Sequence, residues 1–191
     1  RNTPIPKRQN GASKSSITLT RQVRKSQRLS GVSGDLQWNV DSQGKLMITG
    51  SGEWKEDGED YPDWHEARDY ITSCEVDVTD IKDASDFFAD LPYLQHITFT
   101  RFDTSKTTNM SGMFYCCHNL QSLDLSKWDL SKVESGGEYF LSGTVSLNRI
   151  KTPVNLSKEV SLPDGIWKDE DGNRYTVLPQ NRTTSILLKK E

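Results

Sequence analysis

The residues best suited to chemistry are Cys116, Cys117 and His118, which follow one another in the sequence, and two further histidines, His65 and His96. A cysteine beside a histidine can supply the nucleophile and the base of covalent catalysis. Neighbouring residues of a helix point apart, however, and no Asn or Asp is indicated as the group that orients the base. The run also lacks the ligand spacing of a zinc site. The sequence therefore predicts a buried, unreactive thiol at Cys117, with Cys116 pointing elsewhere.

Carboxylates gather in two places where a metal ion could bind. The segment 55–64 reads KEDGEDYPDW, and residues 169–172 read Asp-Glu-Asp-Gly. Calcium binds carboxylate oxygens, but the first segment does not have the spacing of an EF-hand loop, and the second lacks the downstream acidic ligand. The chain also contains no G-x-S-x-G, no phosphate-binding glycine loop and no H-E-x-x-H. We therefore predict no metal, no cofactor and a binding protein rather than an enzyme.

The elements that position any functional residue belong to an internal repeat between Leu94 and Leu147. LQHITFTRFDTSKTTNMSGMFYCCHN is followed, 26 residues on, by LQSLDLSKWDLSKVESGGEYFLSG. Self-similarity at such a period is typical of a stacked solenoid. The same spacing places a weaker unit from about residue 68, with Ile71 on Ile97, and a fourth strand that ends at Pro153.

Each unit divides into two halves of different periodicity. The first halves, 94–99 and 120–125, alternate as half-buried strands do. Asp-Thr-Ser at 103–105 and Asp-Leu-Ser at 129–131 predict corners after them. In the second halves apolar residues recur at i, i+3, i+4 and i+7, which predicts a short helix with one buried stripe. The stripe residues are Ala84, Phe87, Phe88 and Leu91 in one unit and Met110, Met113, Phe114 and Cys117 in the next.

Hairpin patterns flank the repeats. Leu36, Trp38 and Val40 alternate before a turn at 41–44, and alternation resumes up to Ile48. A second hairpin turns at Asp-Gly, residues 171–172, and SILLKK at 185–190 suggests a last strand. A hairpin at each end would cover the exposed edges of a solenoid.

The first 34 residues differ from the rest in charge, because they contain eight Lys or Arg and no acid, whereas the remainder has an acidic excess. The plainest interpretation is a solvated linker. Alternatively the arm binds an anionic surface, or residues 17–23 add a strand to the acidic body. Nucleic acid is disfavoured, because no aromatic residue interleaves the basic ones. No apolar run is long enough to span a membrane.

The repeats resemble those of the BspA-like leucine-rich repeat surface proteins of bacteria, whose 26-residue unit reads LxxLDLSxfDTSKVTNMSxMFxxCxx. The resemblance covers residues 94–146 closely and 68–93 loosely. Residues 33–54 followed by 62–76 resemble the module that precedes such repeats, and residues 162–179 resemble the module that often closes them. Glycine is usual in the family where Cys116 stands. The resemblance implies an α+β repeat fold, a short leucine-rich repeat solenoid (a right-handed β/α coil) with β-hairpin caps at both ends. It also implies export to the bacterial cell surface.

We therefore expect four segments: a basic amino-terminal arm or linker (1–34), an amino-terminal β-hairpin capping module (35–67), the leucine-rich repeat solenoid (68–163) and a carboxy-terminal β-hairpin module (164–191). Trp54 and Trp64 are expected to plug the first repeat. The expected core comprises Trp38, Leu46, Ile48, Ile71, Phe88, Leu94, Ile97, Phe99, Phe102, Met113, Phe114, Leu120, Leu123, Leu125, Trp128 and Phe140.

The strand residues that alternate with this core are expected to face solvent and form the binding face. We expect a non-catalytic extracellular module for recognition or adhesion that binds a protein or a glycan. One alternative is a structural spacer or targeting module that presents a neighbouring domain, and another is an enzyme with a site near residues 55–64 or His96. The expected face comprises Tyr70, Thr72, His96, Thr98, Ser122, Asp124, Arg149 and Lys151.

Overall fold

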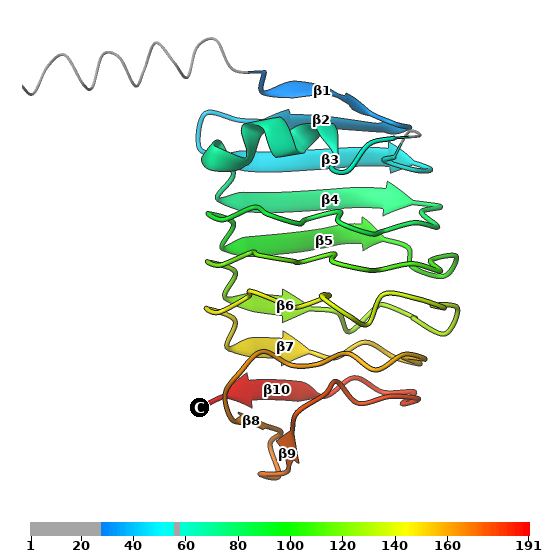
Figure 1. The fold of residues 1–191 in the computed structure, drawn as a ribbon, viewed down its shortest axis with the longest axis vertical. Coiled ribbons are helices and arrows are strands. Elements are labelled where there is room, and N and C mark those ends of the chain that lie inside the picture. The colour runs from blue at the N-terminus through cyan, green and yellow to red at the C-terminus, as the bar shows by residue number, and fades with distance from the viewer. Residues whose placement is uncertain (1–27, 56–57) are drawn as a thin grey trace, which may run out of the picture.

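In the computed structural model, which describes residues 28–55 and 58–191, the chain winds into a β-solenoid of about four turns (Figure 1). Its strands form two sheets that follow one another along the long axis. The first sheet has the order β1 (Ser30–Ser33), β2 (Leu36–Val40), β3 (Lys45–Ser51), β4 (Ser73–Thr79) and β5 (His96–Phe102). The second has the order β6 (Ser122–Asp124), β7 (Arg149–Lys151), β10 (Leu187–Lys190), β8 (Trp167–Lys168) and β9 (Arg174–Tyr175).

The first sheet begins antiparallel and becomes parallel where the solenoid turns start. β1 pairs with β2 and β2 with β3 in antiparallel fashion, whereas β3 pairs with β4 and β4 with β5 in parallel. At the β2–β3 turn, the carboxylate of Asp41 accepts hydrogen bonds from the amides of Gln43 and Lys45 at 2.8 and 3.0 Å. This Asx turn explains why residues 41–44 reverse the chain.

The predicted basic arm needs one correction. Ser30–Ser33 were assigned to a linker, but they form β1, in which Ser30 is paired with Asn39 and Ser33 with Leu36. Backbone pairing to β2 supplies this strand, so its polar composition did not reveal it. Residues 1–27, including the strand considered at 17–23, lie outside the described residues.

The second sheet has an order that the sequence did not predict. β6 and β7 are parallel, but β10 is antiparallel to both β7 and β8, and β8 pairs with β9. The last strand of the chain therefore lies inside this sheet, between β7 and β8 (Figure 1). Leu188 of β10 is fully buried, which explains why this strand holds its inner position.

The second half of each unit is a chain of tight turns, so the predicted helices are wrong. The amides of Phe88 and Asp90 donate to the carbonyls of Met113 and Tyr115 in the next turn, at 2.9 and 2.7 Å. In an α-helix these amides would instead donate to carbonyls four residues earlier in the same segment. The stripe residues are nevertheless all buried, because repeated tight turns also bring positions i, i+3, i+4 and i+7 to one side. The one helix in the described residues is the 3-10 helix η1 (Asp63–Tyr70).

The first unit is also shorter than a constant period implies. Ile71 was placed on Ile97, but the residue paired with Ile97 is Cys74, 23 positions upstream. Beyond the strands the step returns to 26 residues, because Asp83 bridges Asn109. The segment from Cys74 to Asp83 is therefore three residues shorter than the matching segment from Ile97 to Asn109. Part of this difference is a bulge in β5, where the register shifts between Val76 and Asp77.

The core follows the solenoid axis. All predicted core residues are buried except Ile97 and Phe99, which are only partly buried. Phe88, Phe114 and Phe140 come from consecutive turns and pack at ring-centroid distances of 5.2 and 5.1 Å. The two predicted plugs, Trp54 and Trp64, are 0% and 1% exposed. Among the described residues, no helix has the length and apolar character needed to cross a membrane.

Candidate functional site

Six of the eight predicted face residues lie in line on neighbouring strands. His96 and Thr98 belong to β5, Ser122 and Asp124 to β6, and Arg149 and Lys151 to β7. Ser122 is paired with Arg149 and Asp124 with Lys151. The residues between them, such as Leu123 and Ile150, are buried, so these six side chains share the outer face of the solenoid.

Tyr70 and Thr72 do not belong to this face. Tyr70 is the last residue of η1, and Thr72 precedes β4, where its hydroxyl donates to the Gly44 carbonyl at 3.4 Å. The register instead brings Ser73 and Glu75 beside His96 and Thr98. The shorter first unit explains this error, because a 26-residue step points three residues too far back.

The strand face is interrupted between β5 and β6, which belong to different sheets. The amide of Gln121 still donates to the Gln95 carbonyl at 3.2 Å, but further on the amide of Leu125 donates to Lys151 of β7 at 2.9 Å. Beyond this point β5 and β6 are therefore not paired as neighbouring strands of one sheet. A groove of about 340 Å³ lies between them, and its lining includes Ile97, Thr98, Phe99, Arg101, Asp124, Lys127 and Trp128.

An aromatic pair forms the apolar part of this groove. Phe99 packs edge-on against Trp128 at a ring-centroid distance of 4.9 Å. Phe99 is only partly buried, whereas Trp128 is 2% exposed. The indole N–H of Trp128 has no hydrogen-bond acceptor among the described residues, and a buried donor without an acceptor is unfavourable.

Charged groups border the groove. Asp124 accepts from the amide and hydroxyl of Ser126 at 3.1 and 2.5 Å, and its carboxylate lies 3.3 Å from the Lys151 ammonium. Partial burial alone would raise the pKa of Asp124, but these hydrogen bonds and the Lys151 charge outweigh it and lower the pKa. The carboxylate is therefore ionised at neutral pH. The aromatic pair and the charged groups at the border together suit a ligand that has both apolar and polar surface.

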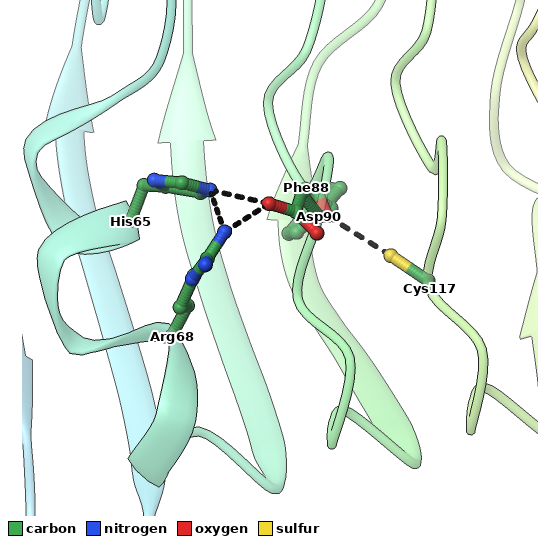
Figure 2. A network of polar contacts seen from close by, with 5 residues as sticks. All are labelled: His65, Arg68, Phe88, Asp90 and Cys117. Atoms are coloured by element: carbon green, nitrogen blue, oxygen red, sulfur yellow. Dashed lines mark hydrogen bonds and ion pairs between the residues drawn. The ribbon is translucent and has the colours of Figure 1, made fainter.

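A second polar cluster joins η1 to the turns (Figure 2). The Asp90 carboxylate contacts the ring of His65 at 3.1 Å and the guanidinium of Arg68. On the other side of Asp90, the Cys117 thiol donates to the Phe88 carbonyl at 2.9 Å. Burial raises the pKa of Cys117 to about 12. The thiol is therefore protonated at neutral pH, whereas a nucleophilic cysteine needs a thiolate.

The structure describes the two acidic segments that were considered, and not predicted, as metal sites to different extents. Within residues 55–64, Glu56 and Asp57 lie outside the described residues, so the prediction that this segment holds no metal is not tested. In the turn at 169–172 the Asp169 carboxylate accepts from the amides of Asp171 and Asn173 and from the Tyr175 hydroxyl, at 3.0, 2.9 and 2.8 Å. It stabilises the hairpin. In the part of the chain that the structure describes, no three His, Cys, Asp or Glu side chains gather as metal ligands would.

Sequence reasoning missed the groove because it assigned both aromatic residues to the core. One signal was available. Strict alternation from Ile97 through Phe99 would put Arg101 inside, but the buried residue is Phe102. A break of this kind in a strand pattern is typical of a β-bulge, and bulges often lie where a sheet is opened or redirected.

Comparison with known proteins gives a family but no activity. No curated protein matches the chain in sequence. A crystal structure of a leucine-rich repeat protein from Eubacterium ventriosum is similar to 70% of this chain, with 18% sequence identity and a TM-score of 0.31. The similarity covers 46% of that protein, so this chain spans less than half its length, and a match this weak supports no argument about function. The family described as "Mycoplasma protein of unknown function, DUF285" matches residues 66–162, just over half of the 191 residues, and the chain belongs to this family.

Proposed function

We propose that this chain is a non-catalytic recognition module that binds an extracellular protein or glycan through the strand face of its solenoid. The observation that carries the proposal is the groove between β5 and β6. It combines the partly exposed ring of Phe99 with Asp124 and Lys127, so it offers apolar contact and charged hydrogen-bonding groups side by side.

The extracellular part of this proposal rests on the resemblance of residues 94–146 to bacterial surface repeats. Cysteine chemistry does not compete strongly with it, because Cys117 is kept as a buried thiol. An enzymatic role would need a nucleophile other than the Cys117 thiol of the polar cluster in Figure 2.

An unbiased binding screen tests the proposal. We would present the purified chain to a glycan array and to a panel of extracellular proteins, and then repeat each positive result with a groove variant, Thr98→Ala/Asp124→Ala/Lys127→Ala. Binding should be lost in the groove variant, because two charged groups and a hydroxyl that border the site are removed. A matched control, Thr183→Ala/Glu159→Ala/Lys158→Ala, removes the same groups elsewhere and should bind normally. Equal binding by both variants would contradict the proposal.

A structural spacer is the second candidate, and the internal ion pairs of the strand face favour it. Lys45 pairs with Glu75, and Arg101 with Asp77 at 2.7 Å. Charges that satisfy one another across strands stabilise a solvated sheet and need no ligand. A spacer predicts that the screen finds no ligand for either the natural chain or its variants.

A further inference from the structure

Three basic residues lie directly beside one another across the second sheet. Arg149 of β7 is paired with Lys189 of β10, and Lys189 is paired with Lys168 of β8. Lys168 is in turn paired with Arg174 of β9, a strand that is turned relative to β10 in Figure 1. We call Arg149, Lys189 and Lys168 the basic row.

The side chains of the basic row point away from the core. Directly paired residues of neighbouring strands share one face of a sheet. Arg149 and Lys189 are exposed, and Lys168 is half-buried. The residues next to them along the three strands are buried on the opposite face, and these are Ile150, Leu188 and Trp167.

The charges of the basic row are only partly neutralised. Lys168 lies 2.5 Å from a carboxylate oxygen of Glu191. Neither Arg149 nor Lys189 has an ion-pair partner within 4.0 Å among residues 28–55 and 58–191. The nearby Asp124 is paired with Lys151 in the adjacent row of the sheet.

Like charges directly opposite each other in a sheet destabilise it. The repulsion in the basic row disappears when an anion lies across it. We propose that the basic row binds an acidic polysaccharide that carries a carboxylate or sulfate on each sugar. This inference rests on the proposed recognition by the strand face, but it uses the second sheet and not the groove.

The geometry of the row favours a polysaccharide over a peptide. Its charges advance along the solenoid axis by one strand spacing, about 4.8 Å, which is close to the length of one sugar ring. An extended peptide presents side chains on one face only every second residue, about 6.7 Å apart. An extended acidic peptide therefore matches the spacing of the row less closely than a chain of acidic sugars does.

Single-stranded nucleic acid fits less well for a different reason. Such ligands stack their bases on aromatic side chains beside the charges. The aromatic residue on the strands of the row is Trp167, which is 1% exposed. On the adjacent strand β9, Tyr175 is paired with Trp167 and donates its hydroxyl to Asp169. They lie on the inner side of the sheet and offer no stacking surface to a ligand on the row.

The test uses the full chain and polymers of known charge. Binding to polygalacturonate and to dextran sulfate would be measured by biolayer interferometry, with neutral dextran as the blank. The variant Arg149→Ser/Lys189→Ser should bind about 10-fold more weakly or worse, because two charge-assisted hydrogen bonds are lost. The control Lys132→Ser/Lys158→Ser removes the same charge from other exposed sites and should bind within about 2-fold of the natural chain.

A thermal melt separates lost binding from lost folding. The Arg149→Ser/Lys189→Ser variant should melt at the same temperature as the natural chain or higher, because like-charge repulsion has been removed. Binding by the natural chain should also weaken as the salt concentration rises above about 0.15 M, where charges more than about 8 Å apart are screened.

Several results would overturn the inference. These are absence of binding to both acidic polysaccharides, equal loss in the two double variants, or equally tight binding to poly-glutamate, poly-dT or phosphatidylserine vesicles. The groove variant should keep its affinity for the acidic polysaccharides, and loss in that variant alone would also contradict the basic row. The proposed function fails separately, when no ligand from the screen loses binding in the groove variant.

Discussion

Cys116 has a backbone conformation that an L-amino acid adopts only at an energetic cost. Its φ is 57°, in the left-handed region, and Asp90, one turn earlier, also has positive φ. The bacterial surface repeats that this segment resembles usually have glycine at this position, and glycine adopts the conformation without a clash between its side chain and the backbone. The departure at Cys116 is therefore a local strain in this chain.

Cys116→Gly should stabilise the protein by about 1 kcal/mol, because it removes the left-handed penalty of a residue with a Cβ atom. Urea unfolding measures the change. Cys116→Ala is the matched control, since it removes the sulfur but keeps Cβ, and it should gain little. If both variants gained equally, the thiol rather than the backbone would be responsible.

Gly143→Ala should have the opposite effect, for a related reason. Gly143 has φ 81°, and a Cβ atom there would lie 3.0 Å from the Cα atom of Cys116. Both strain and crowding oppose the new methyl group.

The Cys117 thiol makes stability depend on alkaline pH. Burial raises its pKa from 9.0 to about 12. The unfolded chain therefore releases this proton at a lower pH than the folded chain, and stability decreases between about pH 9 and pH 12. One such group lowers the unfolding free energy by up to about 1.4 kcal/mol for each pH unit in that window. Urea unfolding near pH 8 and near pH 10 should show a smaller decrease in Cys117→Ala than in the natural chain.

Phe114 is the central ring of the core. It lies 5.2 Å from Phe88, 5.1 Å from Phe140 and 6.2 Å from Trp128 between ring centroids. Phe114→Ala should lower the unfolding free energy by about 3 to 5 kcal/mol, because it opens a cavity between three turns. Tyr93→Ala, at a 51% exposed position, should change it by about 0.5 kcal/mol or less.

At the scale of elements, the turns that replace the predicted helices determine how the repeats cohere. Each alternate amide reaches the next turn of the solenoid, as Phe114 does to Phe140 at 3.0 Å. Neighbouring units are therefore joined by backbone hydrogen bonds on both their strand side and their turn side. The cluster around Asp90 adds η1 to this stack through His65 and Arg68 (Figure 2).

Asp90→Asn should loosen η1 without unfolding the solenoid. The neutral Asn side chain lacks the negative charge that pairs with Arg68, so we expect the unfolding free energy to fall by about 1 kcal/mol. We also expect faster hydrogen exchange at the backbone N–H of His65, which donates to the Pro62 carbonyl at 2.9 Å. Exchange in β4 and β5 should stay slow. Uniformly faster exchange over the whole chain would show that Asp90 supports more than the docking of η1.

At the scale of the whole molecule, the order of the second sheet ties the end of the chain to its middle. β10 pairs with β7 and with β8, so it joins residues 149–151 to residues 167–168. The basic row exists only because of this insertion. Both the sheet and the proposed acidic-polysaccharide site depend on one strand of four residues.

Leu188→Ala tests this dependence. Leu188 is 0% exposed and lies opposite Ile150. Its truncation should lower stability by about 2 to 5 kcal/mol and open the loop at 176–184 to limited proteolysis. The half-buried neighbour Leu187→Ala should have a smaller effect, and equal effects would mean that β10 is not held by its buried face.

The sequence by itself determined which residues are buried and that the chain repeats. Alternation at 120–125 and the spacing of Met110, Met113 and Phe114 predicted the inner side of these units, and those apolar residues are buried. It also predicted the corners, where Ser105 and Ser131 donate their amides to the carboxylates of Asp103 and Asp129. These features follow from a residue and its near neighbours, which is the information a local pattern contains.

Only the tertiary structure decided which strand lies beside which. The register of Cys74 against Ile97, the groove between β5 and β6, and the pairing of Arg149 with Lys189 all join residues more than 20 positions apart. The tertiary structure also decided that the second half of each unit forms turns and not a helix. The spacing of apolar residues shows which side chains are buried, but it does not show whether a backbone amide donates within its own segment or to the next turn. Backbone groups must all find partners, and in a stacked repeat those partners come from other turns of the chain.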